Sequence, residues 1–349
     1  MKKMFQSRKT FKDRDYILTV EDIFFTVVGY VHPPNRVVAY PKYAPEKRKK
    51  SYRRVLPFYT IGCLKEALAH LKEEYPEYLY VDENGLEFSA VPLERIKTHY
   101  CPEKKVEELL SRKPKDELEA LASKIVLELS KESGVPIEFF GLTGSILIGL
   151  HHPKFSDVDI TVYGRKNSLK VKETILNLYE KGNSNFKKFS GEILKSWCED
   201  KARLYPLTVT EAEKLYKRIW NRGIYSKKMF SIHPIRLDEE IKERYGEKVY
   251  SQNGLVEAEA IVKDSTESIF MPSTYLVEDV KVKSGLDVKV KEVVSYEGLY
   301  GGIFEEGEKI VVKGVLEKVE SRVSKENYWR IVVGSLKADG KDYIKPKKF

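Results

Sequence analysis

The stretch that decides the fold is GSILIGLHHPKFSDVDITVY, residues 144–163. Between Asp157 and Val162 polar residues alternate with apolar ones, a period of two that is typical of a strand with one buried face. The alternation puts Asp157 and Asp159 on the same face, with their Cα atoms about 6.5 Å apart at the usual strand rise. Because both carboxylates can then converge on one cation, the pattern predicts a site for Mg²⁺ (or Mn²⁺), which binds oxygen ligands.

A Gly144-Ser145 turn stands upstream of this strand. Such a turn, where it opens a short helix, can bind phosphate through backbone N–H groups. Before it, residues 116–133 carry the apolar stripe of a helix that Gly134 ends, and residues 137–141 are expected to form a short buried strand. Helix, strand, turn, helix and carboxylate strand together predict an α/β unit.

These motifs resemble those of the DNA polymerase β-type nucleotidyltransferase superfamily. Its signature is a hydrophobic residue and Gly-Gly/Ser, followed after a gap by Asp-hydrophobic-Asp/Glu-hydrophobic. Gly144-Ser145 and Asp157-Val158-Asp159-Ile160 match it, whereas Thr143 stands where a hydrophobic residue is common. Most of the chain, including His32 to Val37, is also similar to an archaeal group of predicted nucleotidyltransferases.

The resemblance implies a two-metal mechanism in which Asp157 and Asp159 are the catalytic residues and the metal ligands. It also implies that Gly144 and Ser145 bind the phosphates of an incoming nucleoside triphosphate. Metal pairs of this kind stabilise the attacking and leaving oxygens, while the protein supplies position and charge. Residues 13–15, Asp-Arg-Asp, also fit Asp-x-Asp, but without the alternation or the turn we expect a solvated turn there.

The superfamily usually places a third acid on a later strand, and the sequence leaves its identity open. Residues 228–236 form a plausible strand that carries His233 where an acid is expected. Residues 256–262 alternate as well and would put Glu257 and Glu259 on one face.

Basic residues suggest where phosphates bind. A helix predicted over residues 211–221 has cations on one face, and Arg218 and Arg222, four residues apart, are the phosphate-binding candidates. A second basic run, at 47–50 and 53–54, suits single-stranded nucleic acid, although an exposed loop explains it equally well.

The chain divides into three predicted segments of an α+β fold. Residues 1–112 form an α+β module, residues 113–250 the nucleotidyltransferase core, and residues 251–349 a strand-rich domain that we expect to be a small, OB-like barrel. The charge-rich segment 102–115 is the expected linker. Lys345, Lys347 and Lys348 are expected in a frayed tail.

Composition limits the class of protein. The 349 residues carry a formal charge of +9, which favours a polyanionic partner. Cys63, Cys101 and Cys198 show neither zinc-site spacing nor a disulfide framework, so a reducing cytoplasm is expected. The longest apolar stretch, residues 23–31, is too short for a membrane span.

These features predict a metal-dependent nucleotidyltransferase that adds a nucleotide from a nucleoside triphosphate to a nucleic-acid end, with RNA as the favoured acceptor. Two alternatives stay open at this point. One is a nucleic-acid-binding protein of the same fold with little catalysis, and the other transfers the nucleotide to a protein or a small molecule.

Overall fold

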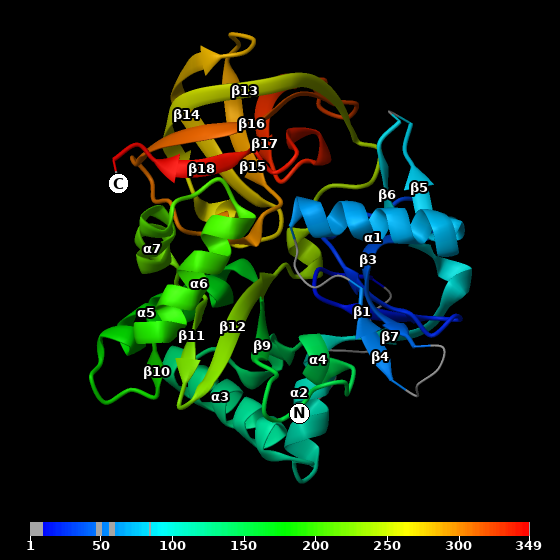
Figure 1. The fold of residues 1–349 in the computed structure, drawn as a ribbon, viewed down its shortest axis with the longest axis vertical. Coiled ribbons are helices and arrows are strands. Elements are labelled where there is room, and N and C mark those ends of the chain that lie inside the picture. The colour runs from blue at the N-terminus through cyan, green and yellow to red at the C-terminus, as the bar shows by residue number, and fades with distance from the viewer. Residues whose placement is uncertain (1–9, 47–50, 56–59, 84, 349) are drawn as a thin grey trace.

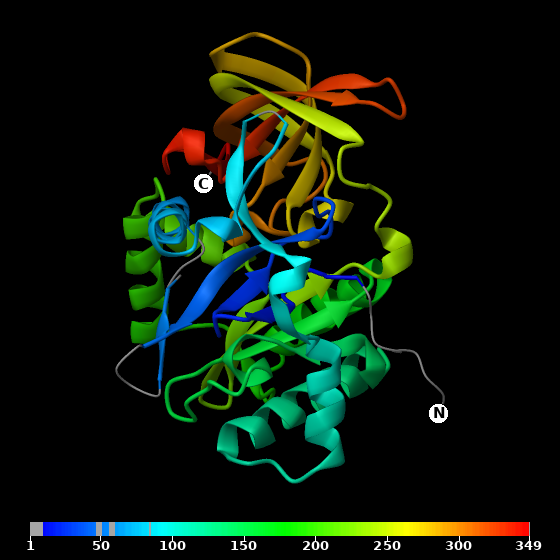
Figure 2. The same cartoon turned by 90° about the vertical axis from the view of Figure 1, so that its right-hand side faces the viewer.

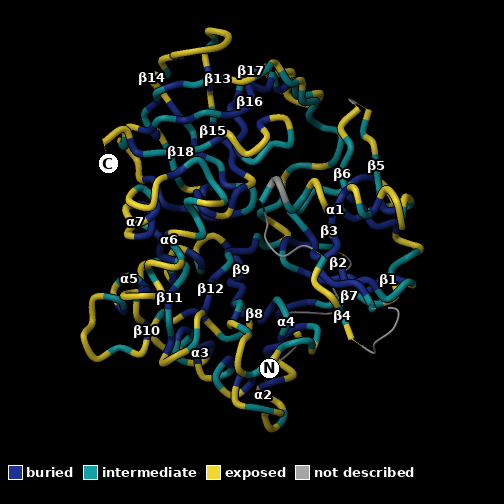
Figure 3. Tube along the Cα trace, in the orientation of Figure 1, coloured by how far each residue is buried: buried dark blue, intermediate teal, exposed yellow. Residues whose placement is uncertain are grey.

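The computed structural model describes residues 10–46, 51–55, 60–83 and 85–348. These residues form three sheets, and each sheet has a buried apolar core. The C-terminal strands lie at one end of the long axis and the helices of residues 102–133 lie at the opposite end (Figures 1 and 2). Buried residues follow the strands of the sheets, whereas loops and outer helix faces are exposed (Figure 3). The chain is therefore a mixed α/β protein.

The central sheet carries the acidic strand. Its strands are β8 (Phe140–Leu142), β9 (Val158–Tyr163), β10 (Phe186–Lys187), β11 (Arg222–Tyr225) and β12 (Lys228–Ile235). They lie in the order β10-β11-β12-β9-β8, and only the β9–β12 pair is parallel. Two helices, α3 (Glu117–Ser133) and α5 (Arg165–Glu180), pack against one face of this sheet. Val158, Ile160 and Val162 of β9 are fully buried in that interface, as the alternation predicts.

Local signals explain where α3 begins and ends. The side chain of Asp116 accepts hydrogen bonds from the backbone N–H groups of Leu118 and Glu119, and Gly134 closes the helix in the left-handed conformation. The predicted limits of α3 are therefore confirmed. The short helix α4 (Gly144–Leu147) follows β8 and the turn residue Thr143.

The N-terminal sheet lies beside the Gly-Ser turn. Its strands follow the order β5-β6-β3-β2-β1-β7, with β4 paired to β3, and α1 (Ile61–Glu74) contributes to the same core. Leu147 of α4 packs against Tyr16, Leu18, Phe24 and Tyr43 of this sheet. The strands are β1 (Tyr16–Thr19), β2 (Phe24–Val27), β3 (Arg36–Pro45), β4 (Tyr52–Arg54), β5 (Leu79–Val81), β6 (Glu87–Pro92) and β7 (Ile96–Tyr100).

The expected linker at 102–115 is wrong for most of its length. Residues Pro102–Ser111 form α2, which buries Val106 and Leu109 in the central core. The hydroxyl of Tyr163 in β9 donates a hydrogen bond to the carboxylate of Glu103, 2.7 Å away. Charged residues outnumber apolar ones in this helix, but Val106 and Leu109 are three apart and share one face.

The C-terminal strands pair in an order that returns to its start. The pairs run β13–β14–β15–β17–β16, and β16 also pairs with β13; β18 continues the sheet from β16. The expected frayed tail is wrong for Lys345 and Lys347, because both lie in ion pairs, with Glu211 and Glu259. The strands are β13 (Lys248–Asp264), β14 (Ser273–Ser284), β15 (Val290–Ser295), β16 (Lys309–Ser321), β17 (Asn327–Val333) and β18 (Tyr343–Pro346).

Two helices lie between β10 and β11 along the chain and pack against the C-terminal strands. They are α6 (Gly191–Leu204), which the sequence analysis missed, and α7 (Val209–Arg218). Leu215 and Tyr216 of α7 belong to the same apolar core as the C-terminal strands. Within the described part of the chain, no helix is both long and apolar enough to cross a membrane.

Candidate active site

The acid pair stands at the beginning of β9. Asp157 directly precedes the strand and Asp159 is its second residue. Because Val158 and Ile160 face α3 and α5, both aspartates emerge on the opposite face of the sheet. Asp157 is exposed, whereas the side chain of Asp159 retains 26% of its accessible surface.

The Gly-Ser turn lies directly against Asp159. The backbone N–H of Thr143 donates a hydrogen bond to the carbonyl oxygen of Asp159, with 2.9 Å between N and O. Gly144 has a φ of +67°, and a Cβ atom at this position would overlap Oδ2 of Asp159 and lie 3.4 Å from its Cγ. Only glycine satisfies both the left-handed backbone and the close approach of the carboxylate.

The neighbouring strands extend the site from Asp159. Ser231 of β12 is the register partner of Asp159, and Arg222 of β11 is the register partner of Ser231. The hydroxyl of Ser231 donates a hydrogen bond to Oδ1 of Asp159. Nε2 of His233 lies 2.8 Å from Oγ of Ser231 and 3.6 Å from Oδ1 of Asp159. A row of polar side chains thus crosses β11, β12 and β9.

The two carboxylates ionise very differently. Repulsion from Asp159, together with burial, raises the pKa of Asp157 to about 6. Because the Asp157 side chain is exposed, repulsion from Asp159 is the main cause. Burial also raises the pKa of Asp159, but the nearby His233 and the hydrogen bond from Ser231 outweigh it and hold that pKa well below its usual range.

The histidine is uncharged at neutral pH. Burial and the nearby charge of Arg14 lower the pKa of His233 to about 4. Its contact with Asp159 is therefore not an ion pair at pH 7. Because the single proton of the Ser231 hydroxyl goes to Asp159, Ser231 must accept a hydrogen bond from Nε2–H of His233, which fixes the tautomer of the ring.

Cations from separate elements lie near the acid pair or near Arg222. The charge of Arg222 lowers the pKa of both aspartates, and that of Arg54 in β4 lowers the pKa of Asp157. Lys201 of α6 stands over the rings of Trp197 and Tyr205, 5.4 and 5.7 Å from their centroids. Burial and the charge of Arg222 lower the pKa of Lys201 to about 8.

The Asp-Arg-Asp stretch at 13–15 is not the solvated turn that the sequence suggested. The side chain of Asp13 accepts a hydrogen bond from the N–H of Gly29, and that of Asp15 one from the N–H of Lys12. Both aspartates are at most 3% exposed. The hydroxyl of Thr143 donates to the carbonyl oxygen of Arg14 at 2.6 Å, which explains a polar residue before Gly144.

Arg218 and Arg222 do not share a helix face. Helix α7 ends at Arg218 and β11 begins at Arg222, so the helix predicted to residue 221 is too long. Arg218 is ion-paired with Glu308, 2.5 Å away, and lies over the ring of Phe304 in the loop before β16. Arg222 alone of these two approaches the aspartates.

Of the candidates for a third polar ligand, the fold brings His233 to Asp159. Glu259 is ion-paired with Lys283 and Lys347, at 3.4 and 2.6 Å, on the solvent side of β13. Glu257 lies on the same strand beside Tyr343. Across residues 10–46, 51–55, 60–83 and 85–348, no group of three or more His, Cys, Asp or Glu side chains could hold a metal ion.

Sequence reasoning missed three residues of the site. Ser231 alternates with His233 along a predicted strand, so the period of two could have identified it. Lys201 comes near Arg222, and Arg14 near His233, only through tertiary packing, and no local pattern marks them. The basic run at 47–50 lies outside the described residues.

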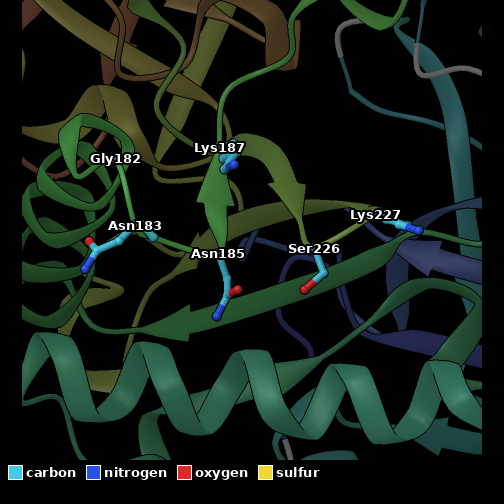
Figure 4. Close-up of a pocket in the computed structure, with 7 residues that line it drawn as sticks. Gly182, Asn183, Asn185, Lys187, Ser226 and Lys227 are labelled. Atoms are coloured by element: carbon cyan, nitrogen blue, oxygen red, sulfur yellow. The ribbon is translucent and has the colours of Figure 1, made fainter.

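A separate polar hollow lies at the edge of the central sheet, between α5 and the β11–β12 turn. It encloses about 420 Å³ and contains neither aspartate (Figure 4). Its lining residues are Gly182, Asn183, Ser184, Asn185, Lys187, Ser226 and Lys227. We assign the acid pair, rather than this hollow, as the candidate active site.

Comparison with known proteins gave a family and one relative. A family model described as Nucleotidyltransferase domain matches residues 122–226, a range that includes Gly144, Asp159 and Arg222 but stops before Ser231. An uncharacterized protein from Methanocaldococcus jannaschii is 32% identical over 345 residues, which cover 96% of this chain and 98% of that protein. No solved structure matches the chain.

Two glycines test the contact between the turn and the acid. Gly144 and Gly149 both have left-handed φ angles, +67° and +70°, but a Cβ at Gly149 meets nothing within 4 Å. Both Gly→Ala variants should therefore lose about 1 kcal/mol of stability from the backbone conformation. Gly144→Ala should additionally displace the Asp159 carboxylate and change the pKa of Asp157, measured by carboxyl-carbon NMR. Equal effects of both variants on that pKa would contradict the contact.

Proposed function

The chain contains a nucleotidyltransferase domain and belongs to the same family as the uncharacterized Methanocaldococcus jannaschii protein, and from this premise we propose that it transfers a nucleotidyl group from a nucleoside triphosphate to the end of an RNA, using a divalent cation. The family supports nucleotidyl transfer in general. The acceptor, the cation and the residue roles are the proposal.

One observation carries the proposal: the Asp159 carboxylate lies against Gly144 while Asp157 stands on the same face two residues away. This arrangement puts a potential phosphate-binding turn and two acids within one small volume. A triphosphate bound by the backbone of Gly144 and Ser145 would have its phosphates next to both carboxylates. Arg222 would neutralise part of their charge, because it already lies close enough to affect both aspartates.

The residues present fit a divalent cation. The raised pKa of Asp157 means that two negative charges are held close together, and a bound cation would relieve their repulsion. Carboxylate oxygens are the donors that Mg²⁺ and Mn²⁺ prefer. Asp157 and Asp159 would hold the ion, which would supply charge stabilisation for the phosphates and activation of the acceptor hydroxyl. Phosphate and water would complete its coordination, since Mg²⁺ usually keeps such ligands.

The surrounding residues would prepare the site rather than react. Ser231 orients the Asp159 carboxylate, and the neutral His233 orients Ser231 in turn. Arg14, just before β1, adds positive charge near His233, and Arg54 of β4 adds it near Asp157. The phosphates would thus enter between positive charges. Because these charges are in place before the substrate binds, the site does not have to rearrange during the reaction.

RNA as the acceptor is supported by charge and by the C-terminal strands. The net charge of +9 favours a polyanion. The pairings of β13, β14, β15, β17 and β16 return to β13, and β15 runs parallel to β17. We propose that these strands are the OB-like barrel expected for residues 251–349, that residues 113–250 act as the catalytic core, and that residues 1–112 act as its N-terminal module. Barrels of this kind bind single-stranded nucleic acid.

A second candidate function has one observation in its favour. Ser231 and His233 occupy the strand beside Asp159, where the family usually supplies a third acid. With only two carboxylates, the same fold would bind a nucleotide and RNA with little catalysis. The assay below separates the two functions.

The assay for the main function uses labelled nucleoside triphosphates, Mg²⁺ or Mn²⁺, and total cellular RNA. We expect the pure protein to label RNA. Asp157→Asn combined with Asp159→Asn should reduce labelling roughly a thousandfold or more, the scale seen when preorganised charge is removed from an active site.

Glu259→Gln is the matched control, because this acid lies on β13, is paired with Lys283 and Lys347, and should not affect labelling. Labelling of RNA by the double aspartate variant at the normal rate would refute the proposal. RNA and nucleotide binding without any labelling would establish the second candidate. Labelled protein or small molecules, with no competition from RNA, would identify a different acceptor.

The two arginines predict a split in the kinetics. Arg222→Gln should raise KM for the nucleoside triphosphate by roughly tenfold to a hundredfold, the scale of one charge-assisted hydrogen bond. Arg218→Gln should leave KM unchanged, because Arg218 is paired with Glu308. Steady-state rates against triphosphate concentration measure both, and equal effects of the two variants would exclude a specific role for Arg222.

A further inference from the structure

Phe155 is the most exposed large hydrophobic side chain in the part of the chain that the structure describes. Its exposed fraction is 83%, followed by 72% for Val323. Single exposed apolar residues are common on protein surfaces, so exposure alone indicates nothing. The position of Phe155 is informative, however, because it lies two residues before Asp157, within about 7 Å of it along the chain.

The loop that carries Phe155 is closed by its own hydrogen bonds. The N–H groups of Phe155 and Ser156 both donate to the carbonyl oxygen of His152, at 3.1 and 2.9 Å. The N–H of His152 donates in return to Oγ of Ser156 at 2.9 Å, and this oxygen lies 3.3 Å from Oγ of Ser145 in the Gly-Ser turn. The loop is thus fastened to the proposed phosphate-binding turn.

A second attachment fixes the start of the loop. Nε2 of His151 lies 2.8 Å from the carboxylate of Asp116, which also caps α3. An aromatic ring on a loop held at both ends loses little conformational entropy when a ligand binds. Phe155 is therefore presented to solvent by a preformed loop.

The ring has a partner on one side and charges nearby. His152 packs against it with 4.7 Å between ring centroids and 33° between the planes. The ammonium of Lys228 in β12 donates to the carbonyl oxygen of Lys154 at 2.7 Å, which brings a cation to the same loop. An exposed aromatic ring on a loop that also holds a cation suits a base that is attached to phosphates.

We propose that Phe155 is a stacking platform for a nucleobase at the mouth of the active site. This inference rests on the proposed function and adds to it a residue that recognises the base. The base belongs either to the incoming triphosphate or to the end of the acceptor RNA. Because every base has an aromatic face, the platform selects nucleotides over inorganic phosphates without strong preference among bases.

Binding to the full-length protein tests the platform with three probes: a nucleoside triphosphate, inorganic tripolyphosphate and a single-stranded oligoribonucleotide. Phe155→Ala should weaken binding of one nucleic probe about tenfold or more, the scale of one base–aromatic stack. Its affinity for tripolyphosphate should stay unchanged. Phe155→Tyr should restore binding, because the ring is kept, and Val323→Ala is the matched control for loss of an exposed apolar side chain.

The outcomes separate this inference from the proposed function. Loss of triphosphate affinity alone would assign the stacked base to the incoming nucleotide, and loss of oligoribonucleotide affinity alone would assign it to the acceptor. Wild-type affinity of Phe155→Ala for both nucleic probes would overturn only the platform. Failure of the unmodified protein to bind any triphosphate would overturn the proposed function together with the platform.

Discussion

Two carboxylates held side by side at the start of one strand are the constraint on which the site depends. Asp157 and Asp159 repel each other, and this repulsion raises the pKa of Asp157 to about 6. The pKa of Asp157 in the folded protein exceeds the ordinary 3.8. The protonated Asp157 therefore stabilises the fold fully below about pH 4, and this stabilisation is lost as the pH rises through 6. At neutral pH the folded protein therefore retains a repulsion that a bound cation would remove.

The packing beneath the acid pair holds the two charges in place. Val158, Ile160 and Val162 are fully buried against α3 and α5. Burial of each such side chain stabilises the fold by about 1.5–3 kcal/mol, which is enough to outweigh the repulsion between two partly hydrated carboxylates. On the other side, the missing Cβ of Gly144 leaves room for the Asp159 carboxylate. The buried face of β9 thus fixes the positions of both acids, and the Gly-Ser turn contacts Asp159.

Local patterns in the sequence predicted those parts of the site that depend on neighbouring residues. Strand alternation predicted that Asp157 and Asp159 share one face of a strand, and the cap residues predicted the limits of α3. Contacts between distant segments could not be predicted from local patterns. Arg14, just before β1, lies close enough to His233 to lower its pKa. Helix α2 was missed because its charges concealed a short apolar stripe. The helix predicted over residues 211–221 was too long, because cationic spacing alone does not show where α7 ends.

The most direct test of the shared cation is to titrate Asp157 by carboxyl-carbon NMR, first in the metal-free protein and then in the presence of Mg²⁺. The account predicts a pKa near 6 without the metal and a value well below it when Mg²⁺ is saturating. A pKa near the ordinary 3.8 in the metal-free protein, or one that millimolar Mg²⁺ does not change, would contradict the idea that Asp157 and Asp159 hold one cation together.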